Sequence, residues 1–395
     1  MNLMDISLRY GCNPNQTPAR ITLPEGVSEM PLRVLNGGAS YINILDGLRG
    51  WQLVRELDAV TGKASAASYK HVSPAGAAVA SPISETFAKG HLIDDAANLS
   101  DLGMAYAKAR SSDRSASFGD FVALSRKVDA SVARLLKREV SDGIIAPGYE
   151  PDALEILKAK KGGNYLVLEI DAGFEPPETE VRLEFGLQLE QKRNDQVISK
   201  DLLANVVTER QAFSPAAVEA LLVATVTLKH TQSNSVALAT AGQAVGIGAG
   251  QQSRIACTRL ACSKAEAWLL KTHPRVLDLP FVEGLARAEK VNLIDQYVRW
   301  QGLGPIEQQQ VRQGLIADPE PIMPSEREAY LKQFEHLVIS SDAFFPFRDN
   351  LDRAARTGVR YVLQAGGSKR DDDVIAAANE HQMVMAFSGT RFFLH

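Results

Sequence analysis

Lys70 and His71 stand side by side in the stretch ASYKHVSPAGAAVA, and this pair is the first feature of the chain that could do chemistry. An ammonium beside an imidazole favours the neutral imidazole, which can accept a proton. Residues 66–69 have the character of a buried strand, and Ser73 with Pro74 is typical of a helix N-cap and first helical turn. The pair is therefore expected at a strand-to-helix junction, where free N–H groups attract anions. The alternative is an ordinary Lys-His pair on a surface loop.

A second Lys-His pair, Lys229 and His230, follows an apolar stretch in ATVTLKHTQSNSVALA. Ser-Asp pairs begin at Ser141 and Ser341, and each leads into an aromatic-containing loop, a helix-like segment and a strand-like one. This repeated order predicts an internal duplication of one α/β unit. The Ser-Asp pairs are further apart than the Lys-His pairs, so the second copy is expected to hold a helical insertion near residues 260–335. The second Lys-His pair is expected to be structural.

The composition of the 395-residue chain is ordinary for a globular protein of two or three domains, with 45% hydrophobic and 23% charged residues. The net charge of −4 gives no indication of nucleic-acid or anionic-membrane binding. No signal peptide is expected in MNLMDISLRYG, and no segment reaches the length of a membrane span. Three cysteines, Cys12, Cys257 and Cys262, make neither a disulfide framework nor a CxxC pair. A reduced, cytoplasmic protein is expected.

The elements that would position the Lys-His pair show hydrophobic periodicity. Ile44, Leu48 and Trp51 have helical spacing, and this helix is expected to end near Gly62. Residues 181–189 alternate as one strand that joins the two halves, with the following residues on one face: Val181, Leu183, Phe185, Leu187 and Leu189. We place the boundary after residue 192, which gives domains of residues 1–192 and 193–395.

The glycine-rich segment VGIGAGQQSR contains Gly246, Gly248 and Gly250 before a helix expected to start near Ser253. A dinucleotide-binding motif requires an acidic residue at the end of a second strand about twenty residues later. Glu266 occupies that position but lies in the helical pattern KAEAWLL. The sequence therefore excludes a Rossmann site and predicts a loop whose backbone approaches a ligand.

Ten motifs in order resemble one known family. They are RYGCNPNQ, YINILDGLRGWQLVREL, ASYKHVSPAGAA, SFGDFVALS, EVSDGIIAPGYE, GLQLEQKRN, KHTQSNSV, GIGAGQQSRIACTRLA, ISSDAFFPFRDN and RFFLH. The chain is similar to the formyltransferase part of the bifunctional purine-biosynthesis proteins, which formylates 5-aminoimidazole-4-carboxamide ribonucleotide (AICAR) with 10-formyltetrahydrofolate. The resemblance implies two cytidine-deaminase-like subdomains and a homodimer with active sites at the subunit interface.

The resemblance also implies roles for individual residues. The catalytic residues would be Lys70, His71 and Asn234. The nucleotide-binding residues would be Arg9, Tyr10, Gly119, Asp142, Phe344 and Arg391, with phosphate as the contact of the two arginines. The folate-binding residues would be Arg254, Ile255, Phe347, Asp349 and Asn350, with Asp349 paired to the pterin. A structural potassium ion would be bound by Thr231, Ser233, Ser235 and Asp342.

The chain departs from the family pattern in three places. The RYG motif begins at Arg9, so the N-terminal cyclohydrolase domain of the bifunctional proteins, and with it the ring-closure activity, is expected to be missing. The chain ends in Leu394-His395 where the family usually has two histidines, and Asn15 stands where histidine is commoner.

Catalysis is expected to depend on proton transfer and positioning, without zinc. The seven histidines are scattered, and no HxE motif is paired with PCxxC. The 5-amine of AICAR is a poor nucleophile and needs a base, which would be His71, and stabilisation of the oxyanion intermediate. Lys70 would keep the imidazole neutral and protonate the leaving folate nitrogen, while Asn234 would bond the formyl oxygen or the amine. Two alternatives stay open: a folate-independent formyltransferase on the same nucleotide, and a non-catalytic protein that binds a purine intermediate.

Overall fold

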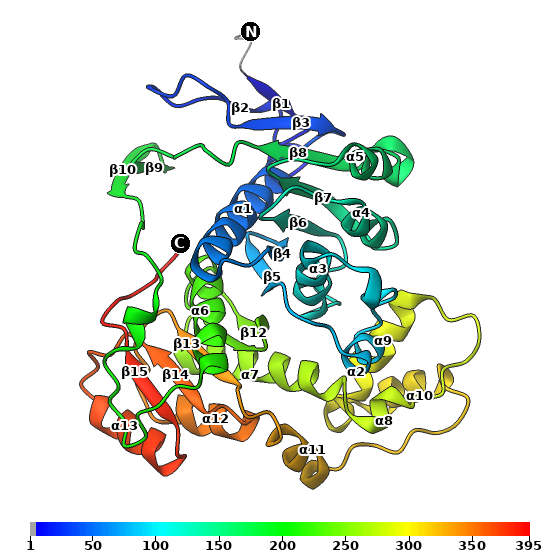
Figure 1. The fold of residues 1–395 in the computed structure, drawn as a ribbon, viewed down its shortest axis with the longest axis vertical. Helices are drawn as coiled ribbons and strands as arrows, with labels where there is room; N and C mark the ends of the chain where they lie inside the picture. The colour runs from blue at the N-terminus through cyan, green and yellow to red at the C-terminus, as the bar shows by residue number, and fades with distance from the viewer. Residues whose placement is uncertain (1–4) are drawn as a thin grey trace.

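A mixed sheet of eleven strands runs through the molecule (Figure 1), in the order β15-β14-β13-β11-β12-β5-β4-β6-β7-β8-β3. The computed structural model describes residues 5–395. The first part of the chain contributes β3 (Leu32–Asn36), β4 (Ser65–Lys70), β5 (Ser73–Val79), β6 (Asp120–Leu124), β7 (Ser141–Ala146) and β8 (Leu166–Ile170). The second part contributes β11 (Val236–Thr240), β12 (Gln243–Gly248), β13 (Val338–Ser341), β14 (Tyr361–Gln364) and β15 (Val384–Phe387). The mixed α/β class that the sequence predicts is confirmed.

Helices cover both faces of this sheet. One face carries α1 (Tyr41–Thr61) and α6 (Pro215–Lys229), which lie side by side in Figure 1. The other face carries α3 (Asp101–Ser111), α4 (Ala130–Lys137), α5 (Pro151–Lys158), α7 (Arg254–Leu270), α12 (Asp349–Thr357) and α13 (Asp371–Glu380). The remaining helical elements are α2 (Glu85–Gly90), η1 (Ala96–Asn98), η2 (Lys160–Gly163), η3 (Lys200–Leu203), α8 (Pro274–Leu277), α9 (Arg287–Tyr297), η4 (Trp300–Gly302), α10 (Pro305–Gln313) and α11 (Pro324–Leu331).

Alternation along the strands divides the apolar residues between the two faces. In β4, Ala67 and Tyr69 join the core under α1 and α6, whereas Ala66 joins the core under α3 and α4. The core under α1 and α6 is continuous across both parts of the chain. The opposite face is divided into two clusters, one for each part. The shared core makes the sheet a single scaffold for residues from both parts.

The two parts of the chain build their strands in the same order. β4–β5 and β11–β12 are antiparallel hairpins. On its other side, β4 pairs antiparallel with β6, and β11 pairs antiparallel with β13 in the same way. β6–β7–β8 and β13–β14–β15 then run parallel. The parts meet where β12 pairs with β5, with Gln243 opposite Ala78 and the Val79 N–H donating to the Gly242 carbonyl at 2.8 Å.

The prediction of a helix directly after Lys70 and His71 is wrong. Ser73 and Pro74 begin β5, which forms a hairpin with β4. Proline lacks the N–H of a regular ladder, and it lies opposite Tyr69 at a shift in the register of the hairpin. The argument from a helix N-terminus beside the Lys-His pair therefore fails.

The predicted sequence markers of the repeat are also wrong. Lys229 ends a helix, α6, and the segment after His230 leads into β11, not into a helix. Ser141 begins β7, whereas Ser341 ends β13. Neither the Lys-His pairs nor the Ser-Asp pairs therefore occupy matching positions in the two parts.

Residues 181–189 are not one strand and do not join the halves. They form an antiparallel ribbon of β9 (Thr179–Glu184) and β10 (Leu187–Lys192) outside the large sheet, and β1 (Ile6–Leu8) with β2 (Ala19–Ile21) makes a second ribbon. Because the chain turns at Phe185 and Gly186, the odd-numbered residues before the turn and those after it point to opposite faces of the ribbon. Leu183 lies opposite Gln188, and Leu187 lies opposite Glu184, so the apolar residues are divided between the two faces. Both faces are exposed.

Two of the glycines in VGIGAGQQSR, Gly246 and Gly248, allow close packing within the protein. Gly246 and Gly248 lie in β12, against the backbone of α7. A Cβ atom at Gly246 would stand 2.2 Å from the Ala261 carbonyl oxygen, and one at Gly248 would stand 2.4 Å from that of Cys257. The helix expected near Ser253 is confirmed, because Ser253 caps α7 and accepts from the Ala256 N–H.

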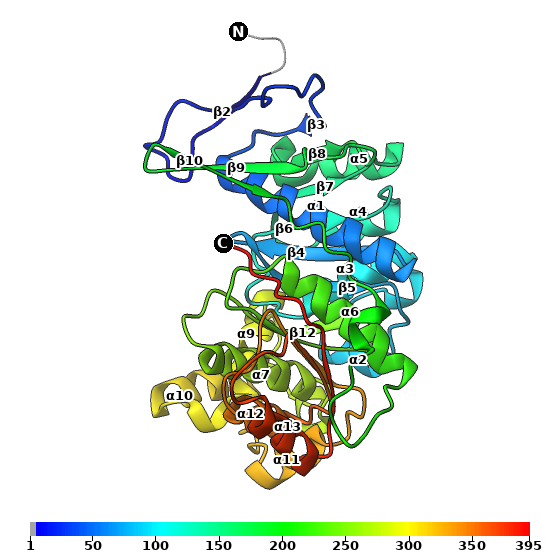
Figure 2. The same ribbon diagram turned by 90° about the vertical axis from the view of Figure 1, so that its left-hand side faces the viewer.

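Other expectations agree with the fold. α1 contains the predicted Ile44, Leu48 and Trp51 and ends at Gly62, which has positive φ. The predicted insertion corresponds to the helices α8 to α11 between α7 and β13. The C-terminus docks through the buried Phe392, and its end lies beside α6 in both views (Figure 1, Figure 2). Within residues 5–395, no helix has the length and apolar character that crossing a bilayer requires.

Candidate functional site

Lys70 and His71 lie at the tip of the β4–β5 hairpin. His71 and Val72 both have positive φ, the conformation that a two-residue hairpin turn needs but that a β-branched residue rarely adopts. The Val72 N–H donates to the Asp46 carboxylate of α1 at 2.7 Å. Burial raises the pKa of Asp46, although this hydrogen bond and the charge of His71 act in the opposite direction. The His71 side chain is exposed, so a substrate can reach it.

The Lys70 ammonium donates to the carbonyl of Phe118 at 2.6 Å. Phe118 and Gly119 belong to the turn that precedes β6, and Gly119 has positive φ. The Gly119 N–H donates to the Val140 carbonyl at 3.0 Å, directly before the Ser141-Asp142 pair of β7. A Cβ atom added to Gly119 would lie 3.9 Å from an Asp142 carboxylate oxygen. The structure thus brings together Lys70, Gly119 and Asp142, three of the predicted site residues.

A pocket of about 600 Å³ lies next to Asp142. It is lined by Arg9, Tyr10, Cys12, Gly38, Ser40, Ile42, Asn43, Asp142, Lys161, Asn164 and Leu166. The Arg9 N–H donates to the Ala39 carbonyl at 2.9 Å, and the Tyr10 carbonyl accepts from the Tyr41 N–H at 3.1 Å. These bonds hold the RYG loop against the start of α1.

The pocket combines three features that favour an anion. The first turn of the 21-residue helix α1 borders it, capped by Ser40 and Asn43. The Arg9 guanidinium lies 5.4 Å from the centre of the Tyr10 ring and donates to Asn43 at 3.4 Å. Lys161 forms an ion pair with Asp142 at 2.8 Å. A helix N-terminus together with an arginine and a lysine suits a phosphate group.

Asn234 and Arg254 lie in a second cluster. Asn234 donates to the carbonyl of Gln251 at 2.8 Å and accepts from the Arg254 guanidinium at 2.7 Å. Arg254 is buried and also forms an ion pair with Asp342. Its guanidinium is therefore bonded inside the protein, where it orients the Asn234 amide.

Three of the four residues predicted to bind potassium come together around the Asp342 carboxylate. The Ser233 hydroxyl donates to it at 2.7 Å, and the Ser235 N–H and hydroxyl donate at 2.8 and 3.0 Å. Thr231 instead donates its hydroxyl to the Thr227 carbonyl within α6. The oxygen-rich donor set fits a hard monovalent cation, although Arg254 already supplies a positive charge to Asp342. In the described part of the chain, no group of three or more His, Cys, Asp or Glu residues is arranged to hold a metal.

The predicted folate-binding residues gather at the facing starts of α7 and α12. Asn350 is buried, accepts from Thr258 of α7 at 2.8 Å and donates to Asp349 at 3.0 Å. Ile255 lies in the first turn of α7. Phe347 is exposed, with the Arg370 guanidinium 5.4 Å from its ring centre, and Phe344 is exposed as well. Exposed aromatic rings beside a carboxylate could accept a flat heteroaromatic ligand.

Arg391 belongs to the second cluster and not to the Arg9 pocket. Its guanidinium lies 4.6 Å from the centre of the Phe393 ring. The neighbouring Phe392 N–H donates to the Asp342 carbonyl at 2.8 Å, and the Leu394 N–H donates to Ser233 at 3.0 Å. A single chain therefore leaves the two predicted phosphate-binding arginines, Arg9 and Arg391, apart.

The second Lys-His pair connects the two parts of the chain. Lys229 and His230 each lie 2.8 Å from a carboxylate oxygen of Glu56 in α1. Burial would raise the pKa of Glu56, but the hydrogen bonds and charges of His230 and Lys229 outweigh it and hold the pKa below its usual value. Tyr69, the residue before Lys70, donates its hydroxyl to the His230 carbonyl at 2.5 Å. This geometry is that of a structural clamp.

The Asn234 loop lies against the Lys-His hairpin within one chain. The Gln232 N–H donates to the Ser73 hydroxyl at 3.4 Å, which joins the loop before Asn234 to the turn after His71. Among residues 5–395, no hydrogen bond or ion pair connects Arg9 or Asp142 with Arg254, Asp349 or Arg391. One chain thus assembles two groups of site residues that meet only near the hairpin.

Comparison with protein families shows whether the motifs of this chain reflect common ancestry with a known family. The model of the family described as "AICARFT/IMPCHase bienzyme" matches residues 3–264, more than half of the chain. The chain belongs to this family. Its similar relatives include bifunctional purine biosynthesis proteins PurH from Magnetococcus marinus, Synechococcus elongatus and Persephonella marina, each 32% identical over 391 to 395 residues. These alignments cover 98% of this chain and 59% of each relative, so the chain spans about three fifths of their length.

Several pocket residues of this family member were not predicted from the sequence. Ser40, Asn43, Lys161 and Asn164 line the pocket but stand outside the motifs given site roles. Ser40 followed by Asn43 is readable as a helix cap before YINILDG, which places the start of α1. Nothing in the sequence showed that this helix start would face Asp142. The position of β7, which carries Asp142, depends on the order of the strands in the sheet, and the sequence does not reveal that order.

Proposed function

We propose that this protein transfers the formyl group of 10-formyltetrahydrofolate to the 5-amino group of AICAR. The observation that carries the proposal is membership of the family, in a chain that retains Lys70 and His71 at an exposed hairpin tip. The pocket beside them has the size and charge for a nucleoside monophosphate. The products would be formyl-AICAR and tetrahydrofolate, within the synthesis of purine nucleotides.

The nucleotide would occupy the pocket with its phosphate near Arg9 and the first turn of α1. Tyr10 and Gly119 would border the nucleotide, and Asp142 would accept hydrogen bonds from its sugar or base. Lys161, which pairs with Asp142 at 2.8 Å, adds a second positive charge to the same wall. The amine to be formylated would then point toward Lys70 and His71.

The reaction needs one bond to form and one to break. The AICAR nitrogen attacks the formyl carbon while His71 accepts its proton, which gives a tetrahedral oxyanion. Collapse of this intermediate breaks the bond to N10 of the folate, and Lys70 supplies the proton that N10 takes as it leaves. Asn234, oriented by Arg254 at 2.7 Å, would stabilise the oxyanion or hold the amine.

The folate would bind at the starts of α7 and α12. Asp349 would accept two hydrogen bonds from the pterin edge, and Asn350 fixes the Asp349 carboxylate at 3.0 Å. Phe347 would pack against its rings, and Ile255 would border it. Phe344, which is exposed, would contact the nucleotide. Potassium at Ser233, Ser235 and Asp342 is part of this proposal only as a structural ion.

A spectrophotometric assay of purified protein with AICAR and 10-formyltetrahydrofolate tests the function directly. Formation of tetrahydrofolate that requires both substrates is the expected result. Transfer from formyl phosphate, or from formate with ATP, but not from the folate would show a folate-independent formyltransferase. Tight AICAR binding with no turnover from any of these donors would show a binding protein and refute the proposal.

We also propose that the protein is a homodimer with active sites shared between subunits. The separation of Arg9 from Arg391 within one chain supports a site completed by a second copy. The β9–β10 ribbon projects on the α1 side of the sheet (Figure 1, Figure 2) and exposes Val181, Leu183, Phe185, Leu187 and Leu189. An isolated two-stranded ribbon is marginally stable in water, and exposed apolar clusters of this kind favour a protein contact.

We further propose that the two parts are duplicated, cytidine-deaminase-like subdomains, divided near residue 192. The repeated strand order, from the hairpins β4–β5 and β11–β12 onward, supports this origin. A cytoplasmic location belongs to the same proposal. All three cysteines are free thiols, which suits a reducing compartment.

A further inference from the structure

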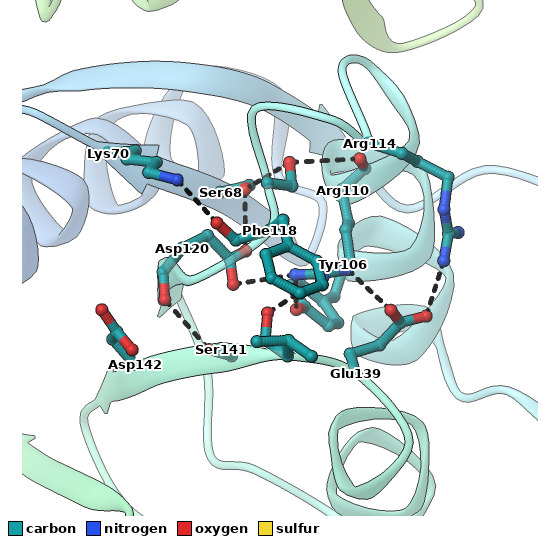
Figure 3. A network of polar contacts seen from close by, with 12 residues as sticks. Ser68, Lys70, Tyr106, Arg110, Arg114, Phe118, Asp120, Glu139, Ser141 and Asp142 are labelled. Atoms are coloured by element: carbon teal, nitrogen blue, oxygen red, sulfur yellow. Dashed lines mark hydrogen bonds and ion pairs between the residues drawn. The ribbon is translucent and has the colours of Figure 1, made fainter. Parts of the chain in front are cut away.

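Arg110 of α3 lies buried beneath the Lys70 end of the site. Its guanidinium donates to Asp120 at 2.8 Å, to Glu139 at 3.1 Å and to the Val140 carbonyl at 3.0 Å. The arginine and both carboxylates are at least nine-tenths buried. Figure 3 shows the bonds to Asp120 and Glu139 converging on this guanidinium.

The partners of Arg110 belong to the two segments that carry the site. Asp120 begins β6 directly after Phe118 and Gly119, and the Phe118 carbonyl receives the Lys70 ammonium at 2.6 Å. Val140 directly precedes Ser141 and Asp142. Arg110 therefore holds both the segment that positions Lys70 and the segment that carries Asp142 (Figure 3).

Additional hydrogen bonds tie the same two segments together. The Ser68 hydroxyl, two residues before Lys70 in β4, donates to Asp120 at 2.7 Å. The Ser141 hydroxyl donates to the Asp120 carbonyl at 3.1 Å. Burial raises the pKa of Asp120, and the Arg110 charge together with these hydroxyl contacts opposes that rise. A buried carboxylate with this many partners is costly to leave unpaired, so the position of β6 depends on Arg110.

We propose that Arg110 is a positioning residue for formyl transfer. It fixes the Phe118 carbonyl, which sets the Lys70 ammonium beside His71, and it fixes the start of β7, which sets Asp142 in the nucleotide pocket. Its planar fork is necessary because it reaches Asp120, Glu139 and Val140 at once, which the single ammonium of a lysine cannot do. The inference rests on the proposed function and adds a residue that touches neither substrate.

Arg114 offers a matched control in the same network. It is buried as deeply as Arg110 and donates to Glu139 at 2.7 Å and to the His91 carbonyl at 3.0 Å. It shares Glu139 with Arg110 (Figure 3), its other bond leads to the end of α2, and among residues 5–395 it makes no hydrogen bond to Asp120 or Val140. A lysine at either position removes a buried guanidinium bonded to Glu139, but only the change at Arg110 also removes the bonds to Asp120 and to the Val140 carbonyl.

The experiment compares Arg110→Lys with Arg114→Lys in the full-length protein, using steady-state kinetics below the melting temperature of each variant. Arg110→Lys is expected to lower kcat by on the order of tenfold or more, since small displacements of catalytic groups are costly. It is also expected to raise the KM for AICAR and to leave the KM for the folate unchanged. Arg114→Lys is expected to lower thermal stability similarly but to keep all three kinetic constants within about twofold of the wild type.

A loss of folded protein would lower kcat alone, so the selective change in the AICAR KM distinguishes positioning from damage. Ser68→Ala, which removes only the hydroxyl bonded to Asp120, gives a milder test if Arg110→Lys does not fold, and should change kcat and the AICAR KM in the same directions. Wild-type constants in folded Arg110→Lys, or equal losses in Arg114→Lys, would overturn the proposal. If the wild type transfers no formyl group, the proposed function fails separately, and calorimetric AICAR affinity of the same variants still tests Arg110.

Discussion

The two Lys-His pairs have the same chemistry but opposite surroundings. Lys229 and His230 are paired with Glu56 and largely withdrawn from water, so their charges are used inside the protein. His71 is exposed at a strained turn, and Lys70 has a backbone carbonyl as its partner. Strained residues at an accessible position are common in functional sites, which favours the first pair for catalysis.

The role of His71 as general base can be tested by substitution. His71→Ala is expected to lower kcat by roughly 100-fold or more, the scale of a positioned base. Binding of AICAR, measured by calorimetry, should largely survive because the pocket residues are unchanged. His230→Ala serves as the comparison. Turnover near that of the wild type in His71→Ala would remove this histidine from the mechanism.

Arg9 lines the proposed nucleotide pocket, and among residues 5–395 no hydrogen bond or ion pair connects it with the residues at the starts of α7 and α12. Arg9→Ala should therefore raise the KM for AICAR by roughly tenfold or more, as expected for the loss of a charge-assisted phosphate contact, while the KM for the folate changes little. Arg33→Ala, at another exposed arginine, which pairs with Glu169, is the control. Equal weakening of both substrates would contradict a phosphate contact at Arg9.

His91 gives a prediction about pH and stability. It is buried against Phe87 and Trp268, and among residues 5–395 neither ring nitrogen has a hydrogen-bond partner. Burial, together with the charges of Lys271 and Arg114, holds the pKa of His91 well below 6.5. Below about pH 6.5, His91 is protonated in the unfolded chain but stays neutral in the folded protein. The free energy of unfolding therefore falls as the pH drops below about 6.5.

His91→Phe should remove this contribution and keep the aromatic stack. Its free energy of unfolding, measured in urea between pH 7.5 and 5.5, should decline less steeply than that of the wild type. The difference in slope is expected to approach roughly 1 kcal/mol per pH unit. Identical slopes in the two proteins would show that His91 is protonated in the folded state.

At the scale of elements, glycines set the distance between the sheet and its helices in both parts of the chain. Gly76 of β5 lies against α3, where a Cβ atom would stand 2.1 Å from the Ala109 carbonyl oxygen. Gly246 of β12 lies against α7 in the corresponding way.

Gly246→Ala should therefore destabilise the protein by about 1–3 kcal/mol through overpacking. Gly302→Ala, where no atom lies within 4 Å, should be tolerated in the same denaturation assay. Equal stabilities would mean that β12 shifts freely.

The sequence predicted elements well where one signal dominated. The spacing of Ile44, Leu48 and Trp51 and the stop at Gly62 defined α1 because periodicity and C-cap agreed. Ser73 and Pro74 misled because a cap followed by proline also fits the start of a strand whose partner strand has a register shift. The segment around Phe185 and Gly186 was predicted wrongly as one strand. A two-residue turn leaves the apolar residues at every second position, but it places those before and after the turn on opposite faces.

The site was predicted by motif and not by geometry. The motifs gave Lys70 and His71 a catalytic role and Asp142 a nucleotide-binding role, but the connection between Lys70 and Asp142 through Phe118 and Arg110 depends on the sheet order β4-β6-β7. Pairing between strands distant in the sequence leaves no local trace. Lys161 escaped notice for the same reason, because it faces Asp142 only after β7 and β8 pair.

At the scale of the whole molecule, the separation of the two residue groups predicts functional complementation. Mixed dimers of His71→Ala and Asp349→Ala subunits, each inactive alone, should recover a part of wild-type activity if each site takes residues from two chains. The dimer interface is expected to bury on the order of 2,000 Å² or more. Sedimentation should confirm the mixed dimers before the assay. Verified mixed dimers without activity would place both residues in a site within one chain, and a monomer active on dilution would exclude shared sites.

The seam between β5 and β12 has a consequence for how the chain reaches its folded state. Inside the parts, the pairs of strands furthest apart in sequence join Leu32 to Ile170 and Val236 to Ser341. The seam joins Ala78 to Gln243, the largest separation in sequence between paired strands of the large sheet. Closing so long a loop is entropically unfavourable until both partners are already ordered. Each part is therefore expected to become structured by itself, with the seam forming last. The loop before Asn234 contacts the Lys-His hairpin beside that seam, so catalytic competence would be among the final properties that a newly made chain acquires.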